Sequence, residues 1–136
     1  MNLVLKESDI LRLEKSLDRM LISSGAHCAL LIDQSGQLIA SSGDPSNLDV
    51  VAISALTAAN FGATAEIARL LGEDEFSLLF HKGKKENVHF SKIGEHFLVV
   101  TLFDDRTTLG IVRLHADRLA KELQDIIQEI EERGEG

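Results

Sequence analysis

The sequence predicts one α+β domain, spanning residues 1–136, in which helices cover the faces of a five-stranded antiparallel sheet. Three observations predict it. Apolar residues recur at helical spacing in three segments, and five short apolar strand segments lie between them in the order α-β-β-α-β-β-β-α. The connections between consecutive strands are short, such as Ile93-Gly94, and such turns join antiparallel hairpins.

The first helix is expected from Ser8, a suitable N-cap, to Gly25, which ends it. Residues 26–33 then predict a buried strand, and residues 38–42 its return strand after a turn at 34–37. The apolar positions of the helix follow one face: Ile10, Leu13, Leu17, Met20 and Leu21.

Residues 48–71 predict a long helix, capped by Asn47 and ended by Gly72, with apolar residues on more than one side. One stripe is expected to pack on the sheet: Ile53, Leu56, Ala63, Ile67 and Leu70. A neighbouring stripe has mostly small residues: Ala52, Ala55, Ala59, Gly62 and Glu66, with Ala58, Phe61 and Ala65 beside it. Only one side of a helix can face a sheet. A helix that is apolar on a second side therefore either binds a partner with that side or is a core helix buried on both sides.

Three further strands are expected at residues 76–80, 87–92 and 95–104. The last of these is apolar almost throughout, which is typical of a central strand that is covered on both faces. A final amphipathic helix is expected to start near residues 114–116. Its apolar stripe is Ala116, Leu119, Ala120, Leu123, Ile126, Ile127 and Ile130.

The strand at 76–80 is expected at an edge of the sheet. An open edge with Phe76, Leu78 and Phe80 favours pairing with another chain, so these three residues are the predicted dimer interface. The alternative is that the basic turn at residues 82–85 itself protects the edge.

Composition excludes several classes of function. The net charge of −8 repels nucleic acid and anionic lipid surfaces. No stretch is expected to insert into a membrane, because charges are expected to interrupt every apolar run. The single cysteine, Cys28, lies in an apolar strand and is expected to be a buried, unreactive thiol in a cytoplasmic protein.

No catalytic, cofactor or metal site is expected. The five histidines never lie three or four residues apart, and the Gly83-Lys84 dipeptide lacks the other residues of a phosphate-binding loop. An enzyme is therefore not favoured. A small-molecule sensor remains an alternative, and it requires a pocket with several convergent polar groups.

Several short segments, in this order and spacing, are similar to the Roadblock family, whose members regulate GTPases or associate with dynein. The likeness covers about the whole chain. The segments are residues 25–33 with Gly36, 70–73, 94–96, 102–104, 109–110 and 112–114.

The resemblance implies that the first and last helices cover one face of the sheet and the middle helix the other. It also implies a homodimer joined through the third strand, with the two middle helices side by side as a platform for a small Ras-like GTPase. Carried over by position, the GTPase-binding residues are Ala55, Ala58, Ala59, Gly62, Ala65 and Glu66.

The expected role is GTPase activation in bacterial cell polarity or motility. Four arginines are candidates by residue type for insertion into the GTPase active site: Arg69, Arg106, Arg113 and Arg118. None lies in a segment that obviously projects from the platform, so an indirect effect on the GTPase is favoured. A scaffold or adaptor that binds the GTPase without changing hydrolysis is the alternative.

Overall fold

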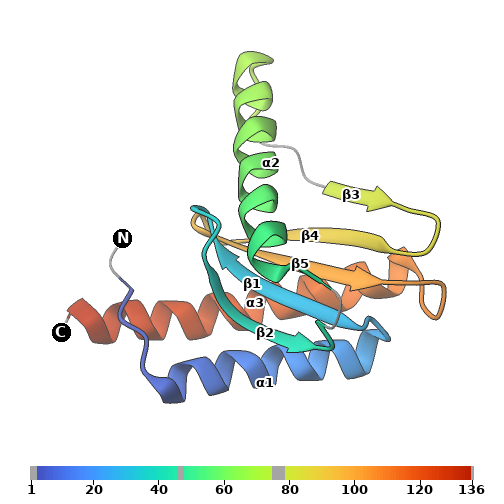
Figure 1. Cartoon of the computed structure of the whole chain (residues 1–136). Coiled ribbons are helices and arrows are strands. Elements are labelled where there is room, and N and C mark those ends of the chain that lie inside the picture. The colour runs from blue at the N-terminus through green and yellow to red at the C-terminus, as the bar shows by residue number, and fades with distance from the viewer. Residues whose placement is uncertain (1–2, 46–47, 75–78, 136) are drawn as a thin grey trace.

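The computed structural model describes residues 3–45, 48–74 and 79–135, and Figure 1 shows their arrangement. Three helices and five strands follow the predicted order. Their bounds are α1 (Glu7–Ser24), β1 (Cys28–Asp33), β2 (Leu38–Gly43), α2 (Val50–Leu70), β3 (Leu79–Lys82), β4 (Asn87–Ile93), β5 (Phe97–Phe103) and α3 (Leu109–Glu135).

The strands form one antiparallel sheet in the order β2-β1-β5-β4-β3. The predicted α+β class with a five-stranded antiparallel sheet is therefore confirmed. Strand β5 is central and all seven of its residues are buried, as its continuous apolar run predicts. Strand β3 is an edge strand, also as predicted.

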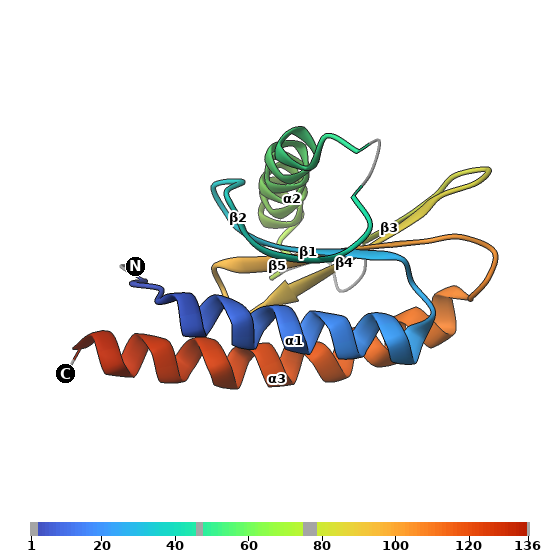
Figure 2. The ribbon, with the colours of Figure 1, turned by 60° about the horizontal axis from the view of Figure 1, so that its bottom comes forward.

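Each face of the sheet has its own apolar core. Side chains of β5 alternate between the two cores, since successive residues of a strand point to opposite faces. Val99 packs with α1 and α3, whereas Val100 packs beneath α2. Figure 2 shows the two layers, with α1 and α3 on one side of the sheet and α2 alone on the other. This confirms the arrangement that the family resemblance implies.

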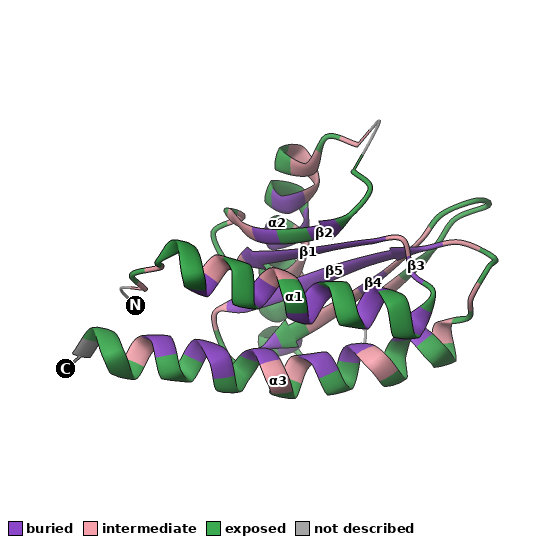
Figure 3. Cartoon of the chain, turned by 90° about the horizontal axis from the view of Figure 1, so that it is seen from below, coloured by how far each residue is buried: buried purple, intermediate pink, exposed green. Residues whose placement is uncertain are grey.

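Helices α1 and α3 bury the predicted stripes. Figure 3 shows buried positions along the sides of both helices that face the sheet. The buried residues of the two stripes are Leu13, Leu17, Met20, Leu21, Ala116, Leu119, Leu123, Ile126, Ile127 and Ile130.

The starts of these two helices differ from the predictions. Helix α1 begins at Glu7 rather than after Ser8, because the Asp9 carboxylate accepts a hydrogen bond of 2.8 Å from the backbone N–H of Lys6. Helix α3 begins at Leu109, about five residues earlier than expected. The Thr108 hydroxyl accepts from the backbone N–H of Ile111 at 3.3 Å and so partners one of the exposed amides of the first turn.

An ion pair joins the first turn of α1 to the last turn of α3. The Arg133 guanidinium donates to both carboxylate oxygens of Asp9, at 3.0 and 2.6 Å. These bonds, with the one from the Lys6 N–H, lower the pKa of Asp9 to about 2. Asp9 therefore stays ionised at neutral pH, and its stabilising contribution is lost as the pH falls from its ordinary value of 3.8 through about 2.

The turn between β1 and β2 lies against α2. The Asp33 carboxylate accepts from the backbone N–H groups of Ser35 and Gln37, both at 3.0 Å. Gly36 has a φ of +93°, and a Cβ at this position would lie 2.9 Å from the Cα of Ala55 in α2. A glycine therefore permits the close contact between this turn and the helix.

We expect Thr101→Val to raise the free energy of unfolding. The Thr101 hydroxyl is fully buried beside α1 and α3 and finds no hydrogen-bond partner among the described residues. Replacing an unpaired hydroxyl by a methyl group of similar shape removes its desolvation cost, so a gain of about 1 kcal/mol is expected in urea denaturation. Thr101→Ser, which keeps the hydroxyl and loses the methyl, is expected to be destabilised. A stability loss in Thr101→Val would contradict the prediction.

Candidate functional site

Helix α2 is the element least covered by the rest of the chain. Its cap is Asp49, whose carboxylate accepts from the Ala52 N–H at 3.0 Å; the predicted cap, Asn47, lies outside the described residues. Only four of its side chains are buried, although the helix has 21 residues: Ser54, Thr57, Ala58 and Ala68. An apolar helix with so little cover has a face available for another molecule.

The first half of α2 holds the helix on the sheet. Ile53 and Phe61 pack against the core that contains Leu30 and Val100. The ring of Phe61 meets that of Phe90 of β4 edge to face, with 5.7 Å between centroids. The second half of the helix extends away from the strands (Figure 1).

The predicted sheet-facing stripe is wrong beyond Ile53. Leu56 and Leu70 are each 70% exposed, and Ile67 is 52% exposed. Helix α2 lies over the strands at its start and then extends past them (Figure 1). A stripe that runs along the whole helix can therefore contact the sheet only in the first part of the helix. Small and polar residues, Ser54 and Thr57 among them, occupy the contact instead.

Five of the six predicted GTPase-binding residues are exposed on α2: Ala55, Ala59, Gly62, Ala65 and Glu66. Ala58 is the exception. It is only 8% exposed, because it lies on the side of the helix that is turned toward the sheet, and it cannot belong to an outward surface. We define the outer face of α2 as these five residues together with the exposed apolar residues Val51, Leu56, Ile67, Leu70 and Leu71.

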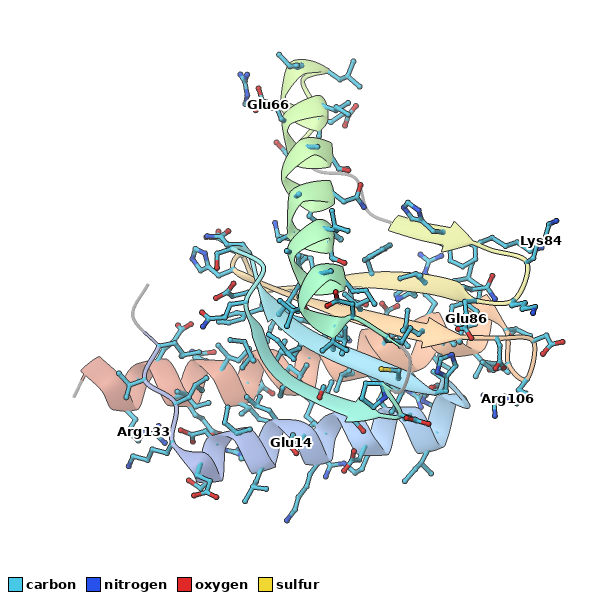
Figure 4. All side chains as sticks on the ribbon, in the orientation of Figure 1. Glu14, Glu66, Lys84, Glu86, Arg106 and Arg133 are labelled. Carbon is cyan, nitrogen blue, oxygen red and sulfur yellow. The ribbon has the colours of Figure 1, made fainter. Side chains whose placement is uncertain are left out.

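The outer face carries one local ion pair. Arg69 donates from Nε to a Glu66 carboxylate oxygen at 3.0 Å, and its Nη2 donates to the other oxygen. These bonds lower the pKa of Glu66 and raise that of Arg69. Figure 4 shows Glu66 near the distal end of the helix, pointing away from the sheet. The face is therefore apolar with a charged, self-neutralised end.

By length and composition alone, α2 is also long and apolar enough to cross a membrane, the one such helix in the described ranges. The expectation that charges interrupt every apolar run is wrong here, because residues 50–65 contain no charged side chain. A helix packed on a sheet at one end can satisfy the same test, so this remains weak support for a membrane segment.

The predicted dimer-interface residues have different outcomes. Phe76 and Leu78 lie outside the described residues, so their role stays a prediction. Phe80 lies in β3, but its ring is half-buried and stacks on Phe103 at 6.0 Å, in the core shared with α1 and α3. Phe80 therefore contributes to the core of its own monomer, and its role in a dimer interface also stays a prediction.

A cavity of about 510 Å³ lies beside β4, along Phe90 and the residues that follow it in that strand. Its lining comes from α2 on one face of the sheet and α3 on the other, together with residues of β4 and β5. The polar lining residues include His89, Ser91, Lys92, Arg113 and Asp117. The apolar pattern of the sequence does not predict that these groups converge.

His89 is the buried titratable group of this cavity, with 3% of its surface exposed. Burial lowers the pKa of His89 and outweighs Asp117, which raises it; Arg113 lowers it further. The Ser91 hydroxyl lies 3.3 Å from its Nδ1. The imidazole of His89 is therefore harder to protonate in the folded protein than in the unfolded chain.

We expect acid to destabilise the protein in part through His89. Because the folded state disfavours the imidazolium, the unfolded chain binds more protons below the ordinary pKa of 6.5, and stability is lost as the pH falls below that value. His89→Gln should reduce the slope of unfolding free energy against pH between pH 7 and 5, by at most about 1.4 kcal/mol per pH unit. Urea denaturation at several pH values measures this, and an unchanged slope would contradict it.

Sequence reasoning missed two features. It places Leu56, Ile67 and Leu70 on the sheet side of α2, although they belong to the outer face and the long uncharged run was a usable signal. A group of three possible metal ligands, His27, Glu86 and Asp104, is brought together from distant segments. Cys28 is buried as predicted, and burial raises the pKa of its thiol.

Comparisons with known proteins agree with this architecture. The family model of the Roadblock/LC7 domain matches residues 12–103. The structure is similar to MglB of Myxococcus xanthus, with a TM-score of 0.87 and 35% identity over 94% of this chain and 96% of that one. It is also similar to the gliding protein MglB of Thermus thermophilus, with a TM-score of 0.86 and 34% identity over 94% and 97%. An MglB solved in a tetrameric arrangement is similar as well, with a TM-score of 0.88 and 35% identity over 95% of this chain and 97% of that one.

Proposed function

Because the chain belongs to the Roadblock/LC7 domain family, we propose that it is a homodimeric, non-enzymatic regulator of a small Ras-like GTPase of the MglA type. The observation that carries the proposal is the uncovered outer face of α2, on a chain about one third identical to MglB proteins over nearly its whole length. The proposed setting is the cytoplasm of a bacterial cell, in polarity or motility.

The homodimer is supported by the edge of the sheet. Strand β3 lies at one end of the strand order and, among the described strands, pairs with β4 alone. An edge of this kind is a template for another strand, and pairing with a second copy gives a continuous sheet that also brings the two α2 helices together. The similar MglB in a tetrameric arrangement supports assembly between copies in this family.

The GTPase contact is supported by the composition of the outer face. Alanines and Gly62 let another backbone approach closely, and the exposed leucines and isoleucine supply apolar area. An interface of standard size needs about 800 Å² from each partner, and two α2 helices side by side offer a larger surface than one.

An inserted arginine is not favoured as the cause of activation. Of the four candidate arginines, Arg69 is bound to Glu66 and Arg106 to Asp104, while Arg113 and Arg118 belong to α3, on the other face of the sheet. We favour selection of a GTPase conformation that positions the GTPase's own catalytic residues.

Single-turnover GTP hydrolysis by an MglA-type GTPase, with and without this protein, tests the proposal. Activation predicts a faster rate that saturates with the concentration of the dimer. Arg69→Ala should retain the stimulation, since no arginine of α2 is required. An unchanged rate despite binding would make the protein a scaffold or adaptor, and absence of binding would reject both.

Sedimentation equilibrium tests the dimer separately. The chain has a mass of 14.9 kDa, so the proposed homodimer should sediment at twice that mass at micromolar concentration. A monomer throughout the micromolar range would remove the shared platform from the proposal.

A further inference from the structure

At one end of the sheet, three potential metal ligands from separate segments lie together. His27 precedes β1, Glu86 precedes β4, and Asp104 follows β5. The strand register explains why they meet: Cys28 is opposite Leu102, and Asn87 is opposite Phe103. Continuing each pairing by one residue places Glu86 opposite Asp104, and His27 opposite Phe103, the residue before Asp104.

The potential ligand atoms are close enough for one ion. His27 Nε2 lies 2.6 Å from a Glu86 carboxylate oxygen, and one such atom from each of the three residues lies within 4.8 Å of the others. In tetrahedral Zn²⁺ sites, ligand bonds of 2.0–2.2 Å place neighbouring ligand atoms about 3.3 Å apart. Side-chain shifts of about 1 Å would therefore reach that geometry.

The backbone at each ligand is held in place. The N–H of His27 donates to the carbonyl of Leu102 at 3.0 Å, and the carbonyl of Glu86 accepts from the N–H of Gly83 at 2.9 Å. The carbonyl of Asp104 accepts from the backbone N–H of Thr107 at 3.3 Å. Binding an ion would therefore require rotation of side chains and little rearrangement of the chain.

Arg106 already pairs with one of the ligands. Its guanidinium donates to both carboxylate oxygens of Asp104, at 2.8–3.1 Å, and this lowers the pKa of Asp104 to about 2. Figure 4 shows Arg106 and Glu86 at the same end of the sheet. The backbone N–H and Nε of Arg106 both donate to Oδ1, and Nε and Nη2 both donate to Oδ2, so an ion would bind here only after one of these bonds is released. Carboxylates that bind metals commonly keep hydrogen bonds to neighbouring groups, and the remaining bonds from Arg106 would orient Asp104.

We propose that His27, Glu86 and Asp104 form a binding site for one divalent transition-metal ion of the Zn²⁺ class. The imidazole nitrogen favours such an ion over Mg²⁺ and Ca²⁺, which prefer oxygen ligands. Three protein ligands leave a position for water. The ion links the β3–β4 turn to the start of β1 and the end of β5, so it stabilises the edge hairpin.

Titration of the full-length, EDTA-treated chain with ZnCl₂ at pH 7, followed by isothermal calorimetry and thermal unfolding, tests this site. We expect one ion per chain and a higher melting temperature with Zn²⁺, and no such effect with Mg²⁺. His27→Ala and Glu86→Gln, each checked for folding by circular dichroism, should weaken Zn²⁺ binding roughly tenfold or more. No GTPase is present, so the outcome is independent of the proposed function.

Two matched variants are the controls. Asp105→Asn changes the exposed carboxylate next to Asp104, and His81→Ala removes an exposed histidine of the same edge hairpin; both should keep wild-type affinity. The proposal would be overturned if the chain bound no Zn²⁺ at a tenfold molar excess of the ion over protein, or if the His27→Ala chain bound Zn²⁺ with wild-type affinity. Equal losses in the ligand and control variants would overturn it too.

Discussion

Ala59→Arg and Gly62→Arg should each weaken binding of the GTPase at least about 100-fold while leaving the chain folded, a loss of about 2.7 kcal/mol. Both positions are exposed on the outer face of α2. A Cβ added at Gly62 meets no atom within 4 Å, so the arginine fits the monomer. In the complex, the arginine side chain would separate the outer face of α2 from the GTPase surface, and its charge would lose its hydration. Calorimetric titration with the GTPase loaded with a non-hydrolysable GTP analogue measures the effect.

Ile22→Arg is the matched control for these variants. Ile22 is an apolar residue of α1, 84% exposed, and α1 lies on the opposite face of the sheet. This variant adds the same charge and should bind the GTPase like the wild type. If the α2 variants bind normally, or if Ile22→Arg is equally defective, the contact has been assigned to the wrong face.

Leu30→Ala is expected to lower the free energy of unfolding by about 2–5 kcal/mol, enough to remove much of the stability of a domain of this size. Leu30 lies in β1, is fully buried, and packs in the core beneath α2. Removing its side chain loses apolar burial and leaves a cavity between the sheet and the helix. Urea denaturation, monitored by circular dichroism, measures the change.

Leu56→Ala is the companion to this variant. Leu56 belongs to α2, above the same core, but is mostly exposed, so its truncation should change the unfolding free energy of the monomer by about 0.5 kcal/mol or less. Any larger cost should then depend on protein concentration, as expected for a surface that a second copy covers. Equal, concentration-independent losses in the two variants would mean that Leu56 is part of the monomer core.

Regular patterns in the sequence predicted most of the fold. The spacing of Leu13, Leu17 and Leu123 indicated amphipathic helices, and the apolar run at 97–103 indicated the central strand, because each pattern has one way of burying its apolar side. The placement of α1 and α3 on one face came from the family resemblance, since periodicity alone does not say which face a helix covers.

The orientation of α2 could not be read in the same way. A helix that is apolar on several sides has no single direction to bury, so Ile53 was placed correctly while Leu56 and Leu70 were not. Helix starts depended on individual hydrogen bonds, such as the one that Asp9 accepts from Lys6. The meeting of His27 with Glu86 depended on strand register, which is set by tertiary structure.

The ion pair between Asp9 and Arg133 has a practical consequence for work in living cells. It holds the start of α1 beside the end of α3, on the layer of the molecule away from α2 (Figure 2). A fluorescent reporter fused at either terminus would thus be tethered behind the sheet, where it leaves the α2 side unobstructed. A tagged protein can then report its location in the cell with the α2 side still accessible to the proposed GTPase.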